Sequence, residues 1–144
     1  MAAIAAFSSF ALTAAIPALQ AAESDAEVAA RKSALELAGA FSNDGFKMRD
    51  GHWAGMVKPG ERILVAVNLY AGNQYWFSVA TNGKIKKMAV ELYDENGGQV
   101  VTENYEAGEK AAVGYSPTSS GQYYVSIELQ EGDASTFCLV YSYK

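Results

Sequence analysis

The sequence predicts an all-β protein, a jelly-roll-like antiparallel β-sandwich of about eight strands with one N-terminal helix. Three observations support this prediction. From residue 62 onward, apolar and polar side chains alternate with a period of two, which is typical of strands with one buried face. Gly, Asn, Asp and Pro separate these segments at the short spacing of antiparallel sandwiches. Each segment also has one strongly apolar face, as expected when two sheets pack across a single core.

Residues 1–22 carry no charged side chain and predict a secretory signal peptide, with cleavage after Ala21 or Ala22. The apolar stretch 4–16 is shorter than the roughly 20 residues that span a bilayer. The usual positive charge at the start is missing, so the alternative is an ordinary buried helix near a misplaced start. We expect an exported protein, periplasmic or secreted, without a membrane anchor.

The net charge of the chain is −5 at pH 7, which argues against nucleic acid as a partner because phosphates need a basic surface. The one cysteine, Cys138, has no partner for an internal disulfide. It lies between Phe137 and Leu139 in a strand-like run, which favours a buried, inert thiol over one that links two chains.

Residues 23–45 predict a helix followed by a linker. Ser24 and Glu27 have the spacing of a capping box, and the residues that follow are good helix formers. The apolar stripe of this helix is thin, formed by Val28, Leu35, Ala38 and Phe41, with Ala34 beside them. Because so thin a stripe is marginal alone in water, we expect the helix to dock on the sheet or on another protein.

Residues 46–144 form the predicted β-sandwich domain. Its expected strands span residues 52–57, 62–70, 74–81, 84–93, 99–105, 110–115, 122–130 and 135–143. The dipeptide Asn82-Gly83 is the strongest hairpin signal, because both residues accept a positive φ. We therefore expect the two strands that flank it to pair directly.

Four linked pieces follow one another in this domain. They are AGNQYWF (71–77), LYDENG (92–97), PTSSGQYYV (117–125) and FCLVY (137–141). In their order and spacing, residues 58–143 resemble the bacterial pre-peptidase C-terminal domain family. The resemblance implies a jelly-roll-like sandwich that serves secreted enzymes as an accessory module. It also implies binding of substrates such as collagen or polysaccharide, in some members with calcium.

This chain departs from the usual context of that family in two ways. No peptidase or other catalytic domain accompanies the module, and the N-terminal helix is an addition. The accessory role therefore does not carry over directly.

The residues that carry most enzyme chemistry are sparse. There is a single histidine, His52, and no Gly-x-Ser-x-Gly sequence for a nucleophile elbow. One histidine and one distant cysteine also make a poor zinc site. We expect a protein that is not an enzyme and needs no cofactor, apart from possible calcium.

The turn at residues 94–98 offers oxygen ligands for calcium. Asp94 and Asn96 are the candidate ligands, together with Glu95 and backbone carbonyls. The alternative is a purely structural turn, because Asp and Asn bond their own backbone and Gly takes a positive φ.

Outward-facing aromatic residues are the candidate ligand-binding residues. Trp76, Tyr93 and Tyr124, together with Tyr70, have the parity opposite to the stronger apolar face. Their expected polar neighbours are Asn68, Ser78, Glu91, Ser126 and Glu128. Aromatic rings with a polar edge stack well on sugars and peptides.

Each of these aromatic residues also has a simpler explanation. The helix would cover Trp76 if it lay over Leu64, Ala66 and Ala80. For Tyr93 and Tyr124 the simpler explanation is cross-strand packing on a sheet surface.

The sequence therefore predicts an exported, non-enzymatic binding module for a glycan or for an extracellular or periplasmic protein. The alternative is a structural or assembly protein that docks through its N-terminal helix or through an edge strand.

Overall fold

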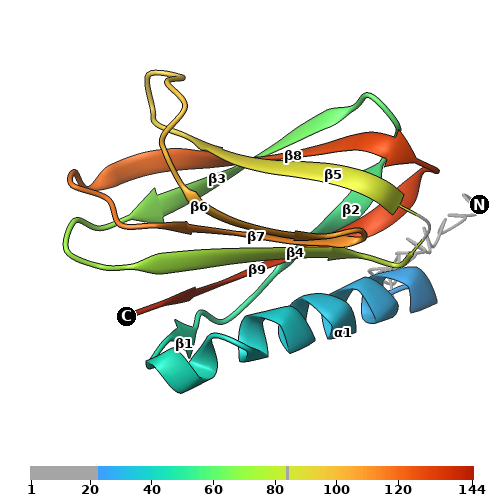
Figure 1. Cartoon of the computed structure of the whole chain (residues 1–144), viewed down its shortest axis with the longest axis horizontal. Helices are drawn as coiled ribbons and strands as arrows, with labels where there is room; N and C mark the ends of the chain where they lie inside the picture. Colours follow the sequence, from blue (N-terminus) through green and yellow to red (C-terminus); the bar gives the residue numbers. More distant parts are fainter. Residues whose placement is uncertain (1–22, 84) are drawn as a thin grey trace, which may run out of the picture.

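The computed structural model describes residues 23–83 and 85–144, and it confirms the predicted antiparallel β-sandwich with one N-terminal helix (Figure 1). The predicted leader, residues 1–22, lies outside the described residues. The described elements are α1 (Asp25–Gly39), the 3-10 helix η1 (Ser42–Asp44), β1 (Lys47–Met48), β2 (Trp53–Val57), β3 (Arg62–Leu69), β4 (Tyr75–Thr81), β5 (Ile85–Tyr93), β6 (Glu103–Ala107), β7 (Lys110–Tyr115), β8 (Gly121–Gly132) and β9 (Ser135–Tyr143).

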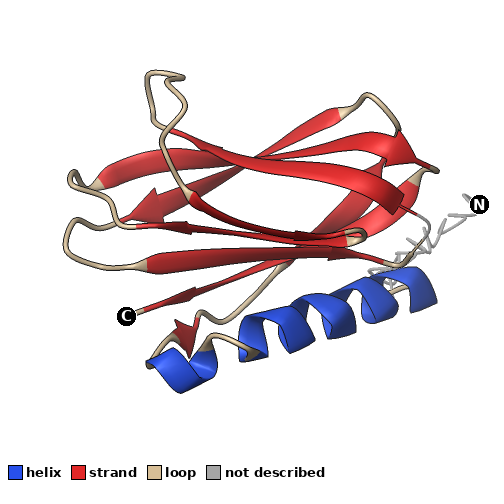
Figure 2. Ribbon diagram, viewed as in Figure 1, coloured by secondary structure: helices blue, strands red, loops and turns tan. Residues whose placement is uncertain are grey.

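The strands form two antiparallel sheets that pack face to face (Figure 2). The larger sheet has the order β1-β9-β4-β7-β6, and β2 also pairs with β9. The smaller sheet has the order β3-β8-β5. The chain crosses between the sheets at six connections, β2 to β3, β3 to β4, β4 to β5, β5 to β6, β7 to β8 and β8 to β9, which is the jelly-roll-like character that the sequence predicts.

The core lies between the sheets and follows the predicted alternation. Phe77 and Leu139 from the larger sheet and Leu92 and Ile127 from the smaller one are fully buried. Burying a side chain of this size contributes about 1.5–3 kcal/mol, so the core is the main source of stability.

The expected hairpin at Asn82-Gly83 is wrong. This turn joins β4 to β5, but these strands lie in different sheets. Instead the turn is tied to the start of β9: Asn82 exchanges backbone and side-chain hydrogen bonds with Thr136, at 3.0–3.1 Å. Gly83 takes a positive φ of 115°, as the sequence suggests, but it makes a corner between two sheets.

The predicted strand at 99–105 starts late. Residue Gln99 forms an isolated bridge with Tyr93 of β5, and the chain then crosses to the larger sheet before β6 begins at Glu103. The short strand β1 was also missed by the alternation pattern, because two residues are too few to show a period.

Helix α1 begins with the predicted capping box. The Ser24 hydroxyl accepts a hydrogen bond from the Glu27 N–H at 3.2 Å, and the Glu27 carboxylate accepts one from the Ser24 N–H at 3.4 Å. The helix lies against the outer face of the larger sheet, below β4 and β9 in Figure 1.

The docking face of α1 differs from the predicted stripe. Ala34 and Ala38 are buried as predicted and Ala30 is buried with them, but Val28 and Leu35 are 43% and 38% exposed. The alanines meet a sheet surface of small side chains, formed by Ala80, Cys138 and Val140. Small side chains on both surfaces let the helix backbone approach the sheet closely. The face of α1 that contacts the sheet is therefore formed by alanines rather than by the larger apolar residues.

The helix also covers less than expected. Leu64 and Ala66 lie on β3 in the smaller sheet, on the far side of the sandwich from α1, and both are exposed.

Burial under the helix raises the pKa of the Cys138 thiol to about 11, so the thiol stays protonated at neutral pH.

Overpacking the alanine face is expected to weaken the fold. Ala34→Leu places extra volume against the sheet and should lower the free energy of unfolding by about 1–3 kcal/mol. Ala29→Leu makes the same change at an exposed position of α1 and should stay within about 0.5 kcal/mol of the parent protein. Urea unfolding followed by circular dichroism measures both; equal effects would contradict close docking of the helix.

Candidate functional site

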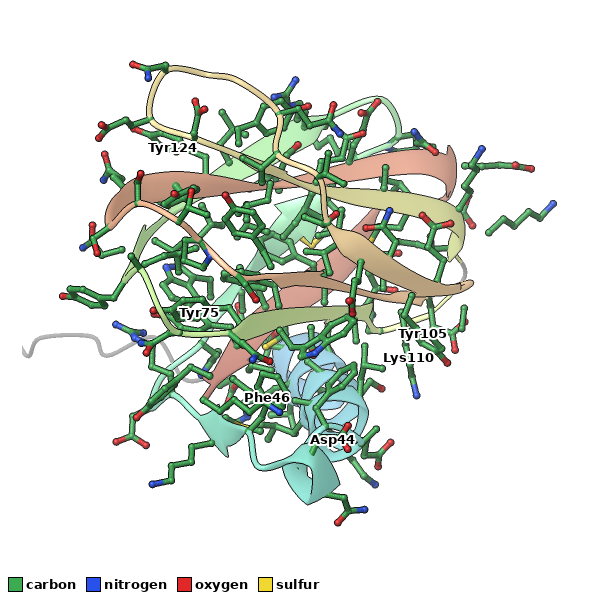
Figure 3. All side chains as sticks on the ribbon, turned by 60° about the vertical axis from the view of Figure 1, so that its left-hand side comes forward. Asp44, Phe46, Tyr75, Tyr105, Lys110 and Tyr124 are labelled. Atoms are coloured by element: carbon green, nitrogen blue, oxygen red, sulfur yellow. The ribbon has the colours of Figure 1, made fainter. Side chains whose placement is uncertain are left out.

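The predicted aromatic residues do not meet at one site. Trp76 lies on β4 in the larger sheet, whereas Tyr93 and Tyr124 lie on β5 and β8 in the smaller sheet. Figure 3 shows Tyr124 on the opposite side of the molecule from Phe46 and Asp44, which follow α1. The chain thus presents them on opposite outer faces.

Trp76 is half-buried by its surroundings. Its ring stacks on Phe41, just after α1, with ring centres 4.3 Å apart and planes at 9°. The ring also passes over Gly114 of β7, where an added Cβ would lie 2.8 Å from Cζ2 of Trp76. The same residue borders a hollow of about 310 Å³ with Phe46, Val101 and Tyr115. Its role in ligand binding stays a prediction.

Tyr93 and Tyr124 are neighbours on the outer face of the smaller sheet, which α1 does not cover. Their Cα atoms are directly paired between β5 and β8. The Tyr93 hydroxyl donates to Glu91 at 2.5 Å, and this hydrogen bond and partial burial raise the pKa of Tyr93. The Arg62 guanidinium lies 4.7 Å from the centre of the Tyr93 ring. These contacts fit cross-strand packing, and ligand binding here stays a prediction.

The polar neighbours expected around these aromatics are divided between the faces. Glu91, Ser126 and Glu128 lie on the outer face of the smaller sheet. Ser78, in contrast, lies on the helix-covered side of β4 and is fully buried. Asn68 lies on the outer face of the smaller sheet too, near the end of β3, where it pairs with Gln122, two residues before Tyr124.

Asp94 organises the turn after β5. Its Oδ1 accepts hydrogen bonds from the backbone N–H groups of Asn96 and Gly98, each at 2.9 Å. The Asp94 carboxylate therefore has a structural task in this turn. Across the described residues, no three His, Cys, Asp or Glu side chains gather closely enough to hold a metal ion. Calcium binding by Asp94 and Asn96 stays a prediction.

His52 lies beside the start of the helix segment rather than in a catalytic arrangement. Its Nε2 is 3.7 Å from Glu23, which also forms a 3.0 Å ion pair with Arg31. The contact with Glu23 is an ion pair only when His52 is protonated.

A further group of residues, which sequence reasoning did not assemble, forms a pocket at the end of the sandwich where β9 finishes. We name it the tyrosine pocket. It has a volume of about 320 Å³ and is lined by Arg49, Asn68, Tyr70, Asn73, Tyr75, Tyr141 and Tyr143. These residues come from the segment after β1, from the end of β3 and its following loop, and from β4 and β9.

The floor of the tyrosine pocket is made of buried rings and its mouth of exposed ones. Tyr75 and Tyr141 are 4% and 6% exposed, whereas Tyr70 and Tyr143 are 62% and 38% exposed. Tyr75, labelled in Figure 3, lies near one end of the sandwich. Tyr75 and Tyr141 meet edge-on with ring centres 6.1 Å apart, a favourable aromatic geometry.

The Tyr75 hydroxyl ties the pocket together. It accepts hydrogen bonds from the Tyr70 N–H at 2.9 Å and from the Asn73 side-chain amide at 3.1 Å. Both lone pairs of this oxygen are then used, and its proton is left to donate to another acceptor. The loop between β3 and β4 is thus held onto the floor of the pocket.

Arg49 supplies the positive charge of the pocket. Its guanidinium carbon lies 5.4 Å from the Trp53 ring centre and 5.2 Å from the Tyr141 ring centre. Burial raises the pKa of Tyr141, and the nearby Arg49 charge partly opposes that rise. Tyr141 therefore stays a neutral phenol at physiological pH and can donate a hydrogen bond.

The alternation pattern could not reveal this pocket. Tyr141 and Tyr143 share the core parity of β9, while Asn68 and Tyr70 have the outward parity of their segment. At the end of a twisted sandwich, residues of both parities meet around the edge. The available signal was the clustering of tyrosine at the ends of two predicted strands, 62–70 and 135–143.

Among the described residues, none of the helices has the length and apolar character needed to cross a membrane.

The contact between Trp76 and Gly114 predicts a sharp mutational effect. Gly114→Ala should lower the free energy of unfolding by about 1–3 kcal/mol, because the new methyl group collides with the indole ring. Gly39→Ala is the matched control: its added Cβ meets nothing within 4 Å, and it should be neutral or stabilising. Urea unfolding monitored by tryptophan fluorescence compares them, and a neutral Gly114→Ala would show that Trp76 is not held over β7.

The turn at Asp94 gives a test that separates a structural role from a metal site. Asp94→Ala removes the acceptor of two backbone N–H groups and should cost about 1–2 kcal/mol of stability. The neighbour Glu95→Ala should cost little, because its side chain is exposed. We expect the same losses in EDTA and in calcium chloride by thermal unfolding; a calcium-dependent stabilisation of the parent protein that Asp94→Ala abolishes would establish the calcium site.

Comparison with known proteins adds no evidence on function. No protein-family model matches the chain, and no curated protein matches its sequence. The resemblance to the pre-peptidase C-terminal domain family stays a prediction.

Proposed function

We propose that this protein is a non-enzymatic binding module for carbohydrate, and that the tyrosine pocket is its ligand site. The observation that carries the proposal is the convergence of four tyrosines, two asparagines and one arginine on a single pocket. Its volume, about 320 Å³, lies at the lower end of the range for small-molecule sites.

The chemistry of the lining suits a sugar. The rings of Tyr70 and Tyr143, exposed at the mouth, offer flat surfaces for the apolar C–H faces of a sugar ring. The amides of Asn68 and Asn73 and the phenols provide donors and acceptors for its hydroxyl groups. Such a lining offers ring surfaces and hydrogen bonds rather than a nucleophile with a general base, which supports binding over catalysis.

The pocket is also built on a rigid scaffold. Tyr75 and Tyr141 lie on paired strands, β4 and β9, in the middle of the larger sheet. The backbone N–H and C=O of Gln74 and Lys144 are joined by reciprocal hydrogen bonds of 2.8 and 3.0 Å. Little ordering is then needed when a ligand binds, which favours affinity.

We also propose that the protein is exported to the periplasm or the cell exterior, where it would meet polysaccharides.

A second candidate is the structural or assembly protein. One feature favours it: β6 is an edge strand of the larger sheet, and all five of its side chains are exposed. Such a strand can pair with a strand of another protein. Docking through the alanine face of α1 is less favoured, because that face is already packed on the sheet.

Removing a mouth ring should weaken carbohydrate binding while sparing the fold. We expect Tyr70→Ala and Tyr143→Ala each to weaken binding by about tenfold, because each loses a stacking surface. Tyr105→Ala removes another exposed tyrosine, on β6 outside the pocket lining, and should bind as the parent does. Affinity electrophoresis in a panel of soluble polysaccharides, with dissociation constants from calorimetry, measures the effect.

Three other results would be decisive. Binding lost in Tyr124→Ala but not in Tyr70→Ala would move the site to the open face of the smaller sheet. Binding lost in Tyr105→Ala but kept in Tyr70→Ala would move the carbohydrate site to β6. No binding to any polysaccharide in the panel would overturn the carbohydrate proposal.

A further inference from the structure

The position of Arg49 is fixed by the sheet and by two rings. Its backbone N–H donates to the Tyr141 carbonyl at 3.0 Å, which places Arg49 beside the floor of the tyrosine pocket. Its guanidinium lies near the rings of Trp53 and Tyr141, at 5.4 and 5.2 Å from their centres. Aromatic rings at these distances stabilise a cation and restrict its movement.

The charge of Arg49 has no counter-charge within the described residues. No carboxylate oxygen there lies within 4.0 Å of its nitrogens, whereas Arg31 pairs with Glu23 at 3.0 Å. The side-chain hydrogen bond of Arg49 is a long one, 3.3 Å from Nη1 to the Asp50 carbonyl. An arginine carries five N–H donors, so most of those in Arg49 are left for solvent or a ligand.

The pocket around Arg49 is rich in donors and has no acid in its lining. The chain as a whole carries 16 Asp and Glu against 11 Lys and Arg, yet the lining contains neither Asp nor Glu. The Tyr75 phenol has both lone pairs occupied and acts as a donor. Tyr141 stays protonated and can also donate. A ligand with an anionic, acceptor-rich group would complement these donors.

From this arrangement we infer that the tyrosine pocket selects a carboxylated sugar, a uronate, and that Arg49 binds its carboxylate. The inference rests on the proposed carbohydrate-binding function and specifies its ligand class. The planar fork of a guanidinium matches a carboxylate with two parallel hydrogen bonds. Tyr70 and Tyr143 at the mouth provide the surfaces on which the sugar ring lies.

The test uses one polymer in two charge states. Oligogalacturonates are compared by calorimetry with their carboxyl-reduced, neutral counterparts, using the parent protein and three variants. Arg49→Gln should weaken oligogalacturonate binding by about ten- to a hundredfold and weaken binding of the reduced oligomer much less, so that the preference for the acidic oligomer is lost. Arg49→Lys keeps the charge but lacks the fork, and should lose an intermediate amount.

Arg62→Gln is the matched control. Arg62 also lies over a tyrosine ring, that of Tyr93, but at the opposite end of β3 from the pocket. It should bind both oligomers as the parent does. Because Arg49 also contacts Trp53 and Tyr141, thermal unfolding of each variant verifies that the fold is intact. Raising the salt concentration should weaken binding of the acidic oligomer only.

The outcomes separate this inference from the proposed function. If the parent binds both oligomers equally and Arg49→Gln changes neither affinity, the uronate inference is overturned and carbohydrate binding stands. If the parent binds no carbohydrate at all, the proposed function fails with it. A short peptide with a free C-terminal carboxylate is the third arm; tighter, Arg49-dependent binding of that peptide than of the oligogalacturonate would overturn the sugar assignment.

Discussion

The burial of β9 on both of its faces is the constraint on which the rest of the structure depends. Eight of its nine residues, Ser135 through Ser142, are buried. The inward side chains Phe137, Leu139 and Tyr141 join the core between the sheets. The outward side chains Cys138 and Val140 need a cover, and α1 supplies it through alanines. The strand therefore specifies both the core and the place of the helix.

Sequence reasoning succeeded where a local rule acts alone. The period of two located most strands, and the spacing of Ser24 and Glu27 located the start of α1. It failed where tertiary packing decides between local options. A helix stripe drawn through Val28 and Leu35 ignores that a surface of small side chains favours alanine. An Asn-Gly turn permits a hairpin but does not require one, and here reciprocal hydrogen bonds between Asn82 and Thr136 hold the turn beside β9 while the chain continues into the other sheet.

The same limit applies to the candidate site. Alternation tells whether a side chain points inward or outward, but not which of two sheets carries it. Trp76 and Tyr124 have the same outward parity, yet they lie on different sheets and so on opposite faces of the sandwich. The tyrosine pocket shows the reverse case, because Tyr70 and Tyr141 differ in parity and still meet at the open end. A site at the edge of a sandwich is set by sheet order, which no short-range pattern encodes.

The pairing of strands distant in the sequence has a kinetic consequence. Strand β2 pairs with β9, β3 pairs with β8, and α1 packs on β9. The first described elements therefore reach their native contacts only after the last strands have formed. Chains dominated by such non-local contacts fold slowly, on the scale of milliseconds to seconds. The entropy of closing long loops is lost before the contacts between distant strands stabilise the chain. The larger sheet cannot close until β9 arrives, and a chain emerging from the ribosome would stay unfolded until then. Under the export that we propose, that delay would let the chain pass a translocation channel as an extended polymer.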